Sequence, residues 1–355
     1  MKGSILSLNS LSKMHSVSKL CHEIAYHSKF LHSQILDFKQ SNSNVIRSCE
    51  RLRYLYNDTC NISERYIQND LEIEEEDDDT NNRYSKKNAN KKQRARTLEM
   101  LESRHVGVIE TLADLKRDSN DINVDLLLKP QIILNILLQH TYTKSKTKSL
   151  FNNNTKEGAV LIDGNMNRIV SSAISEARML GERCYVDQNP EIIFKNNDKI
   201  NPIHLTCIPS SIHFCLVEML KNAIFHTMES YENTYNNINN TLVPSIEVEL
   251  KDNKDLITIS VRDEGDGLPK EKLDQVIQFL ENATISQLVD ENVSYQPMSS
   301  PLKGLGAGLC LTKQHMELFG NLEIKSPVVP ENKNGGTQIL LHFSKDASLP
   351  FFSSY

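Results

Sequence analysis

The 355-residue sequence contains no tryptophan, no long apolar run and no CxxC pair. Without about 18 consecutive apolar residues, no segment is expected to cross a membrane. The seven cysteines show no metal-ligand spacing and are odd in number, which favours free thiols in a reducing compartment. The formal net charge is -6, so a mainly electrostatic nucleic-acid binder is not expected. These absences predict a globular protein that neither binds nucleic acid nor spans a membrane.

Acidic residues are absent from the first 22 positions, which contain Lys2, Lys13, Lys19 and several serines. Leaders that are poor in acidic residues and rich in serine are typical of peptides that direct proteins into organelles. Arginine, which such peptides usually contain, is also missing from this stretch. Residues 1–22 are therefore interpreted either as a transit peptide or as a disordered polar leader.

Helical periodicity dominates residues 23–150. Apolar residues recur at helical spacing after residue 97, and a further apolar helix is expected from about 126 to 139. The first of these sets comprises Leu98, Leu101, Val108, Leu112 and Leu115. A charged segment at about 72–96 interrupts the pattern with an acidic run followed by a basic one, which is typical of a solvated insertion. The pattern predicts an N-terminal helical domain, a four-helix bundle.

A different pattern begins at about residue 156, after the polar run Asn152-Asn153-Asn154. Helices are expected at 165–183, after Pro209-Ser210-Ser211 with a serine as the N-cap, and from about 309 to 319. Strands are expected within 186–195 and at 246–250, 256–262, 322–325 and 338–343. This mixture predicts a two-layer α/β sandwich over residues 156–346, followed by a short tail at 347–355. The fold class is therefore α+β.

Within the long helix expected after residue 211, Glu218 and Asn222 stand four positions apart. Residues at that spacing share a helix face, so a carboxylate and a carboxamide would project into the same space. A carboxylate can act as a general base, and an amide oxygen can bind a hard cation such as Mg²⁺. Because Glu and Asn are common on solvated helix faces, the pair gains meaning only from the three glycine-bearing elements that follow it.

Each of these elements favours a ligand site but also fits an ordinary turn. Asp263 ends an expected strand, and Gly265 and Gly267 permit a sharp turn and a close main-chain approach to a ligand. The Gly304-Leu305-Gly306-Ala307-Gly308 segment leads into a helix, where N–H groups and the helix dipole favour phosphate. Gly336-Thr337 offers an N–H and a hydroxyl before the last strand. Neither the Rossmann fingerprint nor a P-loop is present.

Taken in order, these elements resemble the N, G1, G2 and G3 boxes of the GHKL ATP-binding fold, which histidine kinases, type II topoisomerases and the ninety-kilodalton heat-shock chaperone share. The resemblance implies that Asn222 holds Mg²⁺, that Asp263 binds the amino group of adenine, and that residues 284–303 form a lid over ATP. It also implies a set of further nucleotide-binding residues: Gly265, Gly267, Gly304, Leu305, Gly306, Ala307, Gly308, Leu309 and Thr337.

Beyond these boxes, the chain resembles the mitochondrial kinases of pyruvate dehydrogenase and branched-chain 2-oxoacid dehydrogenase. Glu218-Met-Leu-Lys-Asn222-Ala is similar to their Glu-Leu-Phe/Leu-Lys-Asn-Ala, and Arg104-His105-x-x-Val108 to a helix of their N-terminal bundle. The segment from Ala173 to Glu182 is similar to their linker helix. Phe225 stands where the family usually has an arginine, three residues after the asparagine.

This resemblance implies an ATP-dependent protein serine kinase that phosphorylates, and so inhibits, the E1 component of a 2-oxoacid dehydrogenase complex in the mitochondrial matrix. Glu218 would be the general base or the carboxylate that orients the substrate serine. The lipoyl domain of E2 is a further implied partner, and a homodimer is the implied assembly. The choice between pyruvate and branched-chain E1 stays open. Two alternatives remain: a protein histidine kinase with His105 as the acceptor, and a non-catalytic ATP-binding scaffold of the same fold.

Overall fold

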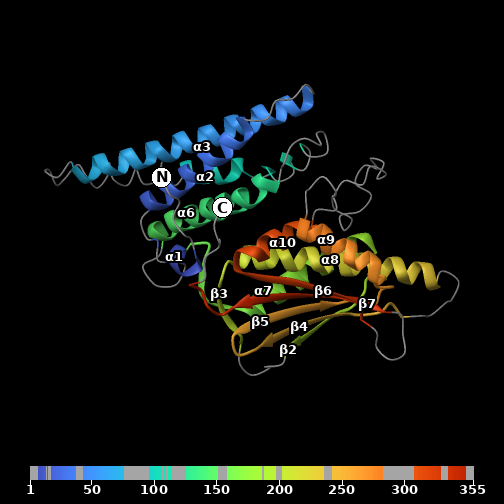
Figure 1. The fold of residues 1–355 in the computed structure, drawn as a ribbon. Helices are drawn as coiled ribbons and strands as arrows, with labels where there is room; N and C mark the ends of the chain where they lie inside the picture. Colours follow the sequence, from blue (N-terminus) through green and yellow to red (C-terminus); the bar gives the residue numbers. More distant parts are fainter. Residues whose placement is uncertain are drawn as a thin grey trace. The chain divides into compact units, whose positions relative to one another are not determined.

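The computed structural model divides the chain into two compact units, Met1–Ile162 and Asp163–Tyr355 (Figure 1). The residues that the structure describes are 7–12, 14, 17–36, 43–75, 96–105, 107–108, 111–112, 115, 125–150, 158–185, 188–196, 202–235, 242–282, 308–328 and 335–348. Among the helices of these ranges, none combines the length and the apolar character that a bilayer crossing requires.

The first unit is helical. Its main helices are α1 (Leu8–Ser12), α2 (Val17–Leu36), α3 (Ser43–Glu75) and α6 (Asp125–Leu150), and residues 96–104 are helical as well. Tyr56 of α3 is fully buried, and its hydroxyl donates a hydrogen bond to Oε1 of Gln131 in α6 over 2.8 Å. The residues expected at helical spacing after residue 97 are all buried, as predicted: Leu98, Leu101, Val108, Leu112 and Leu115.

Segment boundaries in the first unit differ from the expected ones. Two stretches of the expected leader are helical, in α1 and at the start of α2. Their side chains Leu8, Leu11 and Leu20 are buried, so these stretches pack into this unit. α3 continues through Glu75, because glutamate is a good helix former, and the first residues of the expected insertion are therefore helical. α6 extends beyond its expected end near residue 139. Residues 76–95 of the expected insertion lie outside the described residues, as does the asparagine run before residue 156.

The second unit is built on a five-stranded mixed sheet with the strand order β2-β4-β5-β7-β6. Its strands are β2 (Ile192–Asn196), β4 (Ile246–Asp252), β5 (Leu256–Arg262), β6 (Gly320–Val328) and β7 (Gly336–Ser344). β2 runs parallel to β4, and the other neighbouring pairs are antiparallel. A smaller two-stranded sheet pairs β1 (Leu161–Asn165) with β3 (His204–Cys207).

Helices cover one face of the five-stranded sheet (Figure 1). They are α7 (Met166–Cys184), α8 (Pro209–Tyr235), α9 (Lys270–Asn282) and α10 (Gly308–Phe319). Because side chains alternate along a strand, Ile257, Ile259 and Val261 of β5 join the core that residues of α7, α8 and α10 complete. The sheet and its helix layer form the predicted two-layer arrangement, and a helical unit precedes it as expected.

α8 carries the Glu218–Asn222 pair that the sequence analysis singled out. Its apolar stripe is buried, as predicted: Ile212, Leu216, Leu220 and Ala223. The helix begins at Pro209, because proline is well tolerated in a first turn, where its missing N–H would have no intrahelical partner. The carbonyl of Ile208 accepts hydrogen bonds from the N–H groups of Ser211 and Ile212 (3.1 and 3.2 Å). The prediction of a serine N-cap is therefore wrong.

Most expected elements of the second unit are confirmed to within a few residues. α7 follows Asn165, which caps it by accepting a hydrogen bond from the Arg168 N–H over 3.1 Å. The expected hairpin is present as β4 and β5. No expectation covered β1, β3 or α9. Residues 283–307, which include the expected lid, lie outside the described residues.

Candidate functional site

α8 presents Glu218 beside a cation that the sequence interpretation missed. Oε1 of Glu218 forms an ion pair with Nζ of Lys221 over 2.7 Å. Their side chains are only 18% and 13% exposed, so solvent and salt screen this pair less than a surface pair. Asn222, the next residue, is half-buried. The three-residue spacing between Glu218 and Lys221 is a helix-pair signal that could have identified the lysine.

The carboxylate of Glu218 lies against the start of α10. A Cβ atom at Gly308 would overlap Oε2 of Glu218, so the missing side chain lets the carboxylate approach. The first N–H groups of a helix lack intrahelical partners and favour negative charge. Leu309 is half-buried and packs against the core. Four predicted residues of this element lie outside the described part of the chain: Gly304, Leu305, Gly306 and Ala307.

Asp263 follows β5 and is buried, with 7% of its surface exposed. Its Oδ1 atom accepts hydrogen bonds from the main-chain N–H groups of Gly265 (3.0 Å) and Thr337 (3.1 Å). Burial raises the pKa of this carboxyl above its ordinary value, and the two main-chain hydrogen bonds oppose the rise. Because both hydrogen bonds use Oδ1, Oδ2 is the atom left to accept a hydrogen bond from a ligand's amino group.

Close main-chain packing joins the Asp263 turn to the start of β7. Gly267 has a positive φ of 70°, and a Cβ there would overlap the carbonyl of Gly335. A Cβ at Gly336 would overlap the carbonyl of Asp263. Both positions therefore require glycine, the first for its φ and its space and the second for its space. This packing unites the two predicted elements, whose residues Asp263 and Thr337 are 74 positions apart.

The C-terminal half of α8 lies across the same turn. A Cβ at Gly265 would stand 3.2 Å from the main-chain oxygen of His226, which is tighter than ordinary contact. One helical turn further along, the hydroxyl of Ser230 donates a hydrogen bond to Oδ1 of Asp266 over 2.6 Å. α8 therefore fixes the position of the Asp-x-Gly-x-Gly turn, and the structure brings the predicted elements on α8, after β5 and before β7 together.

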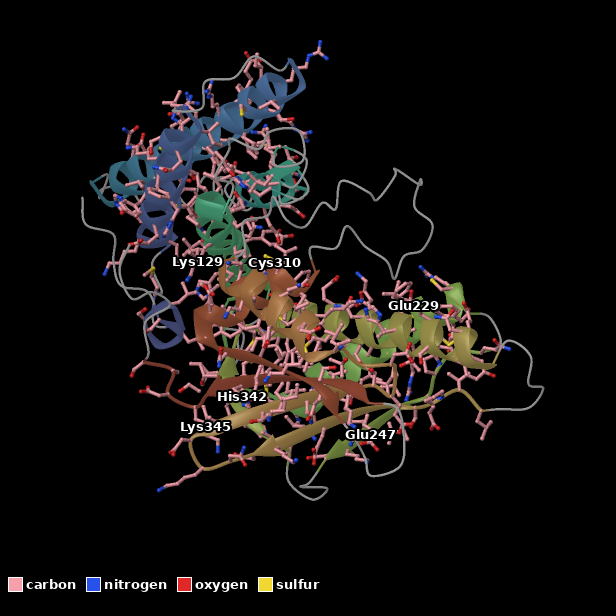
Figure 2. All side chains as sticks on the ribbon, turned by 45° about the vertical axis from the view of Figure 1, so that its right-hand side comes forward. Lys129, Glu229, Glu247, Cys310, His342 and Lys345 are labelled. Atoms are coloured by element: carbon pink, nitrogen blue, oxygen red, sulfur yellow. The ribbon has the colours of Figure 1, made fainter. Side chains whose placement is uncertain are left out.

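α8 thus connects two ends of one candidate site. Glu218 lies at the end where α10 begins, and His226 lies at the end where Asp263 is buried. Eight residues of helix separate them by about 12 Å along the axis. In Figure 2, Glu229 and Cys310 mark α8 and α10 in this helix layer, whereas Glu247 and His342 lie on the strands. An elongated ligand with an anionic end and an amino-bearing end matches this arrangement.

Mg²⁺ fits the donor set at the anionic end. Within the part of the chain that the structure describes, no three His, Cys, Asp or Glu side chains gather into a metal cage. Mg²⁺ that binds together with a nucleotide takes most of its oxygen ligands from phosphate and water, and it needs only one or two protein ligands. The amide oxygen of Asn222 is a donor of that kind, and Glu218 lies on the same helix face.

His105, in the first unit, is poorly placed to accept a phosphoryl group. It is 4% exposed, and its ring nitrogens lie 2.9 Å from Oγ1 of Thr59 and 3.2 Å from Nε2 of Gln131. Burial lowers the pKa of His105 to about 4. Because an acceptor nitrogen must face its donor, this geometry argues against a histidine kinase that uses His105.

Comparison with known proteins adds an independent observation. Residues 207–347 match the family described as histidine kinase-, DNA gyrase B-, and HSP90-like ATPase. The mitochondrial pyruvate dehydrogenase (acetyl-transferring) kinase isozyme 4 of Rhinolophus ferrumequinum is 30% identical over 46% of this chain and 39% of the relative. The human isozyme 4 is 30% identical over 44% of this chain and 36% of the relative. The mitochondrial pyruvate dehydrogenase (acetyl-transferring) kinase of Drosophila melanogaster is 23% identical over 62% of this chain and 56% of the relative.

These similarities cover only part of the relatives, between 36% and 56% of the length of these three. The segment that matches the family begins at the end of β3 and ends just after β7. It therefore contains α8, the Asp263 turn and α10, which are the elements that build the candidate site.

Proposed function

We propose that this protein is an ATP-dependent protein serine kinase, because residues 207–347 match the family described as histidine kinase-, DNA gyrase B-, and HSP90-like ATPase. Its substrate is the E1 component of a mitochondrial 2-oxoacid dehydrogenase complex, and phosphorylation inhibits that complex. The similarity to mitochondrial pyruvate dehydrogenase kinases supports this substrate class and a location in the mitochondrial matrix.

The observation that carries the proposal is the position of α8 between the two ends of the site. The same helix places Glu218 against Gly308 and lies across the turn that holds Asp263. A nucleotide needs such a site, because its phosphates and its base are recognised by different chemistry. Main-chain N–H groups at a helix start suit the phosphates, and a buried carboxylate suits the amino group of adenine.

At the base end, Oδ2 of Asp263 accepts a hydrogen bond from the adenine amino group. Gly265 and Gly267 let the main chain pass close to the ligand, and Thr337 holds the carboxylate in place through its N–H. A buried carboxylate with a fixed acceptor atom selects a base that carries an amino group, because a carbonyl oxygen at that position would leave both groups without a donor.

At the phosphate end, Asn222 holds Mg²⁺, and the N–H groups of the Gly304–Leu309 segment bind the phosphates. Bound Mg²⁺ neutralises negative charge on the transferred phosphoryl group. Glu218 accepts the proton of the substrate serine or orients its hydroxyl. Lys221 forms an ion pair with the Glu218 carboxylate over 2.7 Å, which fixes the direction in which the carboxylate points.

The remaining parts of the proposal concern partners. Residues 284–303 close over ATP as a lid, the lipoyl domain of E2 binds the kinase, and the kinase acts as a homodimer. These assignments rest on the resemblance to the mitochondrial kinases.

Phosphorylation of the pyruvate and branched-chain E1 proteins side by side tests the proposal. The full chain is incubated with [γ-³²P]ATP, Mg²⁺ and each purified E1, and labelled residues are identified. We expect serine labelling of one E1, and loss of labelling in Glu218→Gln and Asn222→Ala. Glu232→Gln, an exposed change on the same helix, is the matched control and should label at the wild-type rate.

Labelling of neither E1, or full-rate labelling by Asn222→Ala, would contradict the proposal. ATP binding without any transfer would instead support the non-catalytic scaffold.

A further inference from the structure

His226 is a residue of the candidate site that the sequence interpretation did not single out. It stands four residues after Asn222 on α8, so it continues the side of the helix that bears Glu218 and Asn222. Its side chain is 61% exposed, which leaves it accessible to a ligand. Its place on the helix alone does not assign a role, because an exposed histidine on a helix is ordinary.

The contact of His226 with the Asp263 turn gives its position meaning. Its main-chain oxygen is the atom that a Cβ at Gly265 would approach to 3.2 Å. His226 also lowers the pKa of the Asp263 carboxyl electrostatically, an effect smaller than the rise that burial causes. Ser230, one turn later, ties the same stretch of α8 to Asp266. His226 is therefore held at the end of the site where the proposed adenine acceptor lies.

Two neighbours hold the imidazole ring. Nδ1 lies 3.3 Å from Oε2 of Glu229, three residues later on α8. The ring stands edge-on to that of Phe225, with centroids 5.2 Å apart, and Phe225 itself packs against the core of the unit. Since Nδ1 faces Glu229, Nε2 on the opposite edge of the ring is the nitrogen that is free to meet a ligand.

We infer that His226 contacts the adenosine part of ATP, with Nε2 forming a hydrogen bond to the nucleoside. This inference rests on the proposed ATP site and adds a second side chain at its base end. Asp263 recognises the amino group, and His226 increases the affinity for the nucleoside as a whole. The phosphates lie toward Gly308, about 12 Å away along α8, so they should not sense this contact.

Binding of adenosine, MgATP and inorganic tripolyphosphate to the full chain tests the inference by calorimetry. We expect His226→Ala to weaken adenosine and MgATP binding by the same factor, about fivefold, as for the loss of one hydrogen bond, and to leave tripolyphosphate binding unchanged. His226→Gln, whose amide nitrogen reaches a position similar to Nε2, should restore most of the affinity. Thermal unfolding of each variant controls for folding.

Kinetics add a readout that a structural role would not give. His226→Ala should raise the KM for ATP and leave kcat unchanged, because the contact is the same in the ground state and the transition state. Adenosine affinity equal to the wild-type value in a folded His226→Ala protein would overturn the inference. So would an equal loss of tripolyphosphate binding, or a failure of Gln to restore affinity.

The same data separate this inference from the proposed function. If wild type binds ATP in a His226-dependent way but labels neither E1, the kinase proposal fails and the inference stands. If wild type labels E1 and His226→Ala binds adenosine normally, the inference fails alone. If wild type does not bind ATP, both fail.

Discussion

Gly308 lies directly against the Glu218 carboxylate, and the missing side chain at Gly308 is what permits the contact. The contact places the proposed base beside a helix start that favours negative charge, where the proposed phosphates bind. A larger residue at Gly308 would have to displace the end of a flexible side chain rather than the main chain. The relationship therefore predicts a substitution that harms catalysis much more than folding.

We expect Gly308→Ala to lower phosphoryl transfer by at least about tenfold, because its Cβ displaces the Glu218 carboxylate from its present position. The free energy of unfolding should change by less than about 1 kcal/mol, since Glu218 can change rotamer. Transfer to E1 and urea denaturation measure the two effects.

Gly320→Ala is the matched control, because its Cβ would overlap the main-chain oxygen of His342, which cannot move aside by rotation. That variant should lose about 1–3 kcal/mol of stability. A Gly308→Ala enzyme with wild-type activity, or one as unstable as Gly320→Ala, would contradict the account of this contact.

Asp263→Asn should separate ligand binding from folding. The Asn oxygen can still accept from the N–H groups of Gly265 and Thr337, but its NH₂ group replaces Oδ2. Two amino groups cannot hydrogen-bond well to each other, so ATP affinity should fall by at least about tenfold with less than about 1 kcal/mol lost in stability. Calorimetry measures the ATP affinity, and urea denaturation measures the free energy of unfolding.

Asp263→Ala removes the acceptor of both main-chain N–H groups and should also destabilise the fold by about 1–3 kcal/mol. If Asp263→Asn bound ATP as tightly as wild type, Asp263 could not be the adenine acceptor.

Buried histidines should make the first unit sensitive to acid. Burial lowers the pKa of His105 and of His27 to about 4, from an ordinary value near 6.5. Between these pH values the unfolded chain binds protons that the native state excludes, so stability falls as pH is lowered from about 6.5 to 4. Each histidine can contribute a loss on the order of 3 kcal/mol.

The measurement is the free energy of unfolding from urea titrations between pH 7.5 and 4.5. His105→Gln should flatten the dependence, and His22→Gln, an exposed change in the same unit, should leave it as in wild type. An unchanged slope in a folded His105→Gln protein would show that His105 does not titrate in this way.

Local geometry explains which parts of the fold and site are predictable from the sequence. Helix faces follow from residue spacing, so the buried stripe of α8 and the common face of Glu218 and Asn222 could be predicted. The helix start could not, because Ser210 and Ser211 fit an N-cap as well as they fit a first turn, and Pro209 decides the matter. α9 carries Leu273 and Val276 at helical spacing after Pro269, a signal too short to stand out.

Tertiary contacts explain what remained hidden. Gly308 can be assigned to a turn or to a phosphate loop from its neighbours, but its contact with Glu218 depends on how α10 packs on α8. His226 has a sequence signal, its spacing from Asn222, yet its meaning comes from Gly265 on a different element. Lys221 likewise has a sequence signal, its three-residue spacing from Glu218, and the structure shows that the two side chains form an ion pair.

The binding of ATP to wild type and to Asn222→Ala, each with and without Mg²⁺, tests the central claim most directly. The claim is that α8 holds MgATP through Asn222, so wild type should bind ATP more tightly when Mg²⁺ is present. Asn222→Ala should bind ATP more weakly than wild type does, and its affinity for ATP should be the same with and without Mg²⁺. A wild-type protein that does not bind ATP, or a folded Asn222→Ala protein that keeps the full Mg²⁺ dependence, would contradict it.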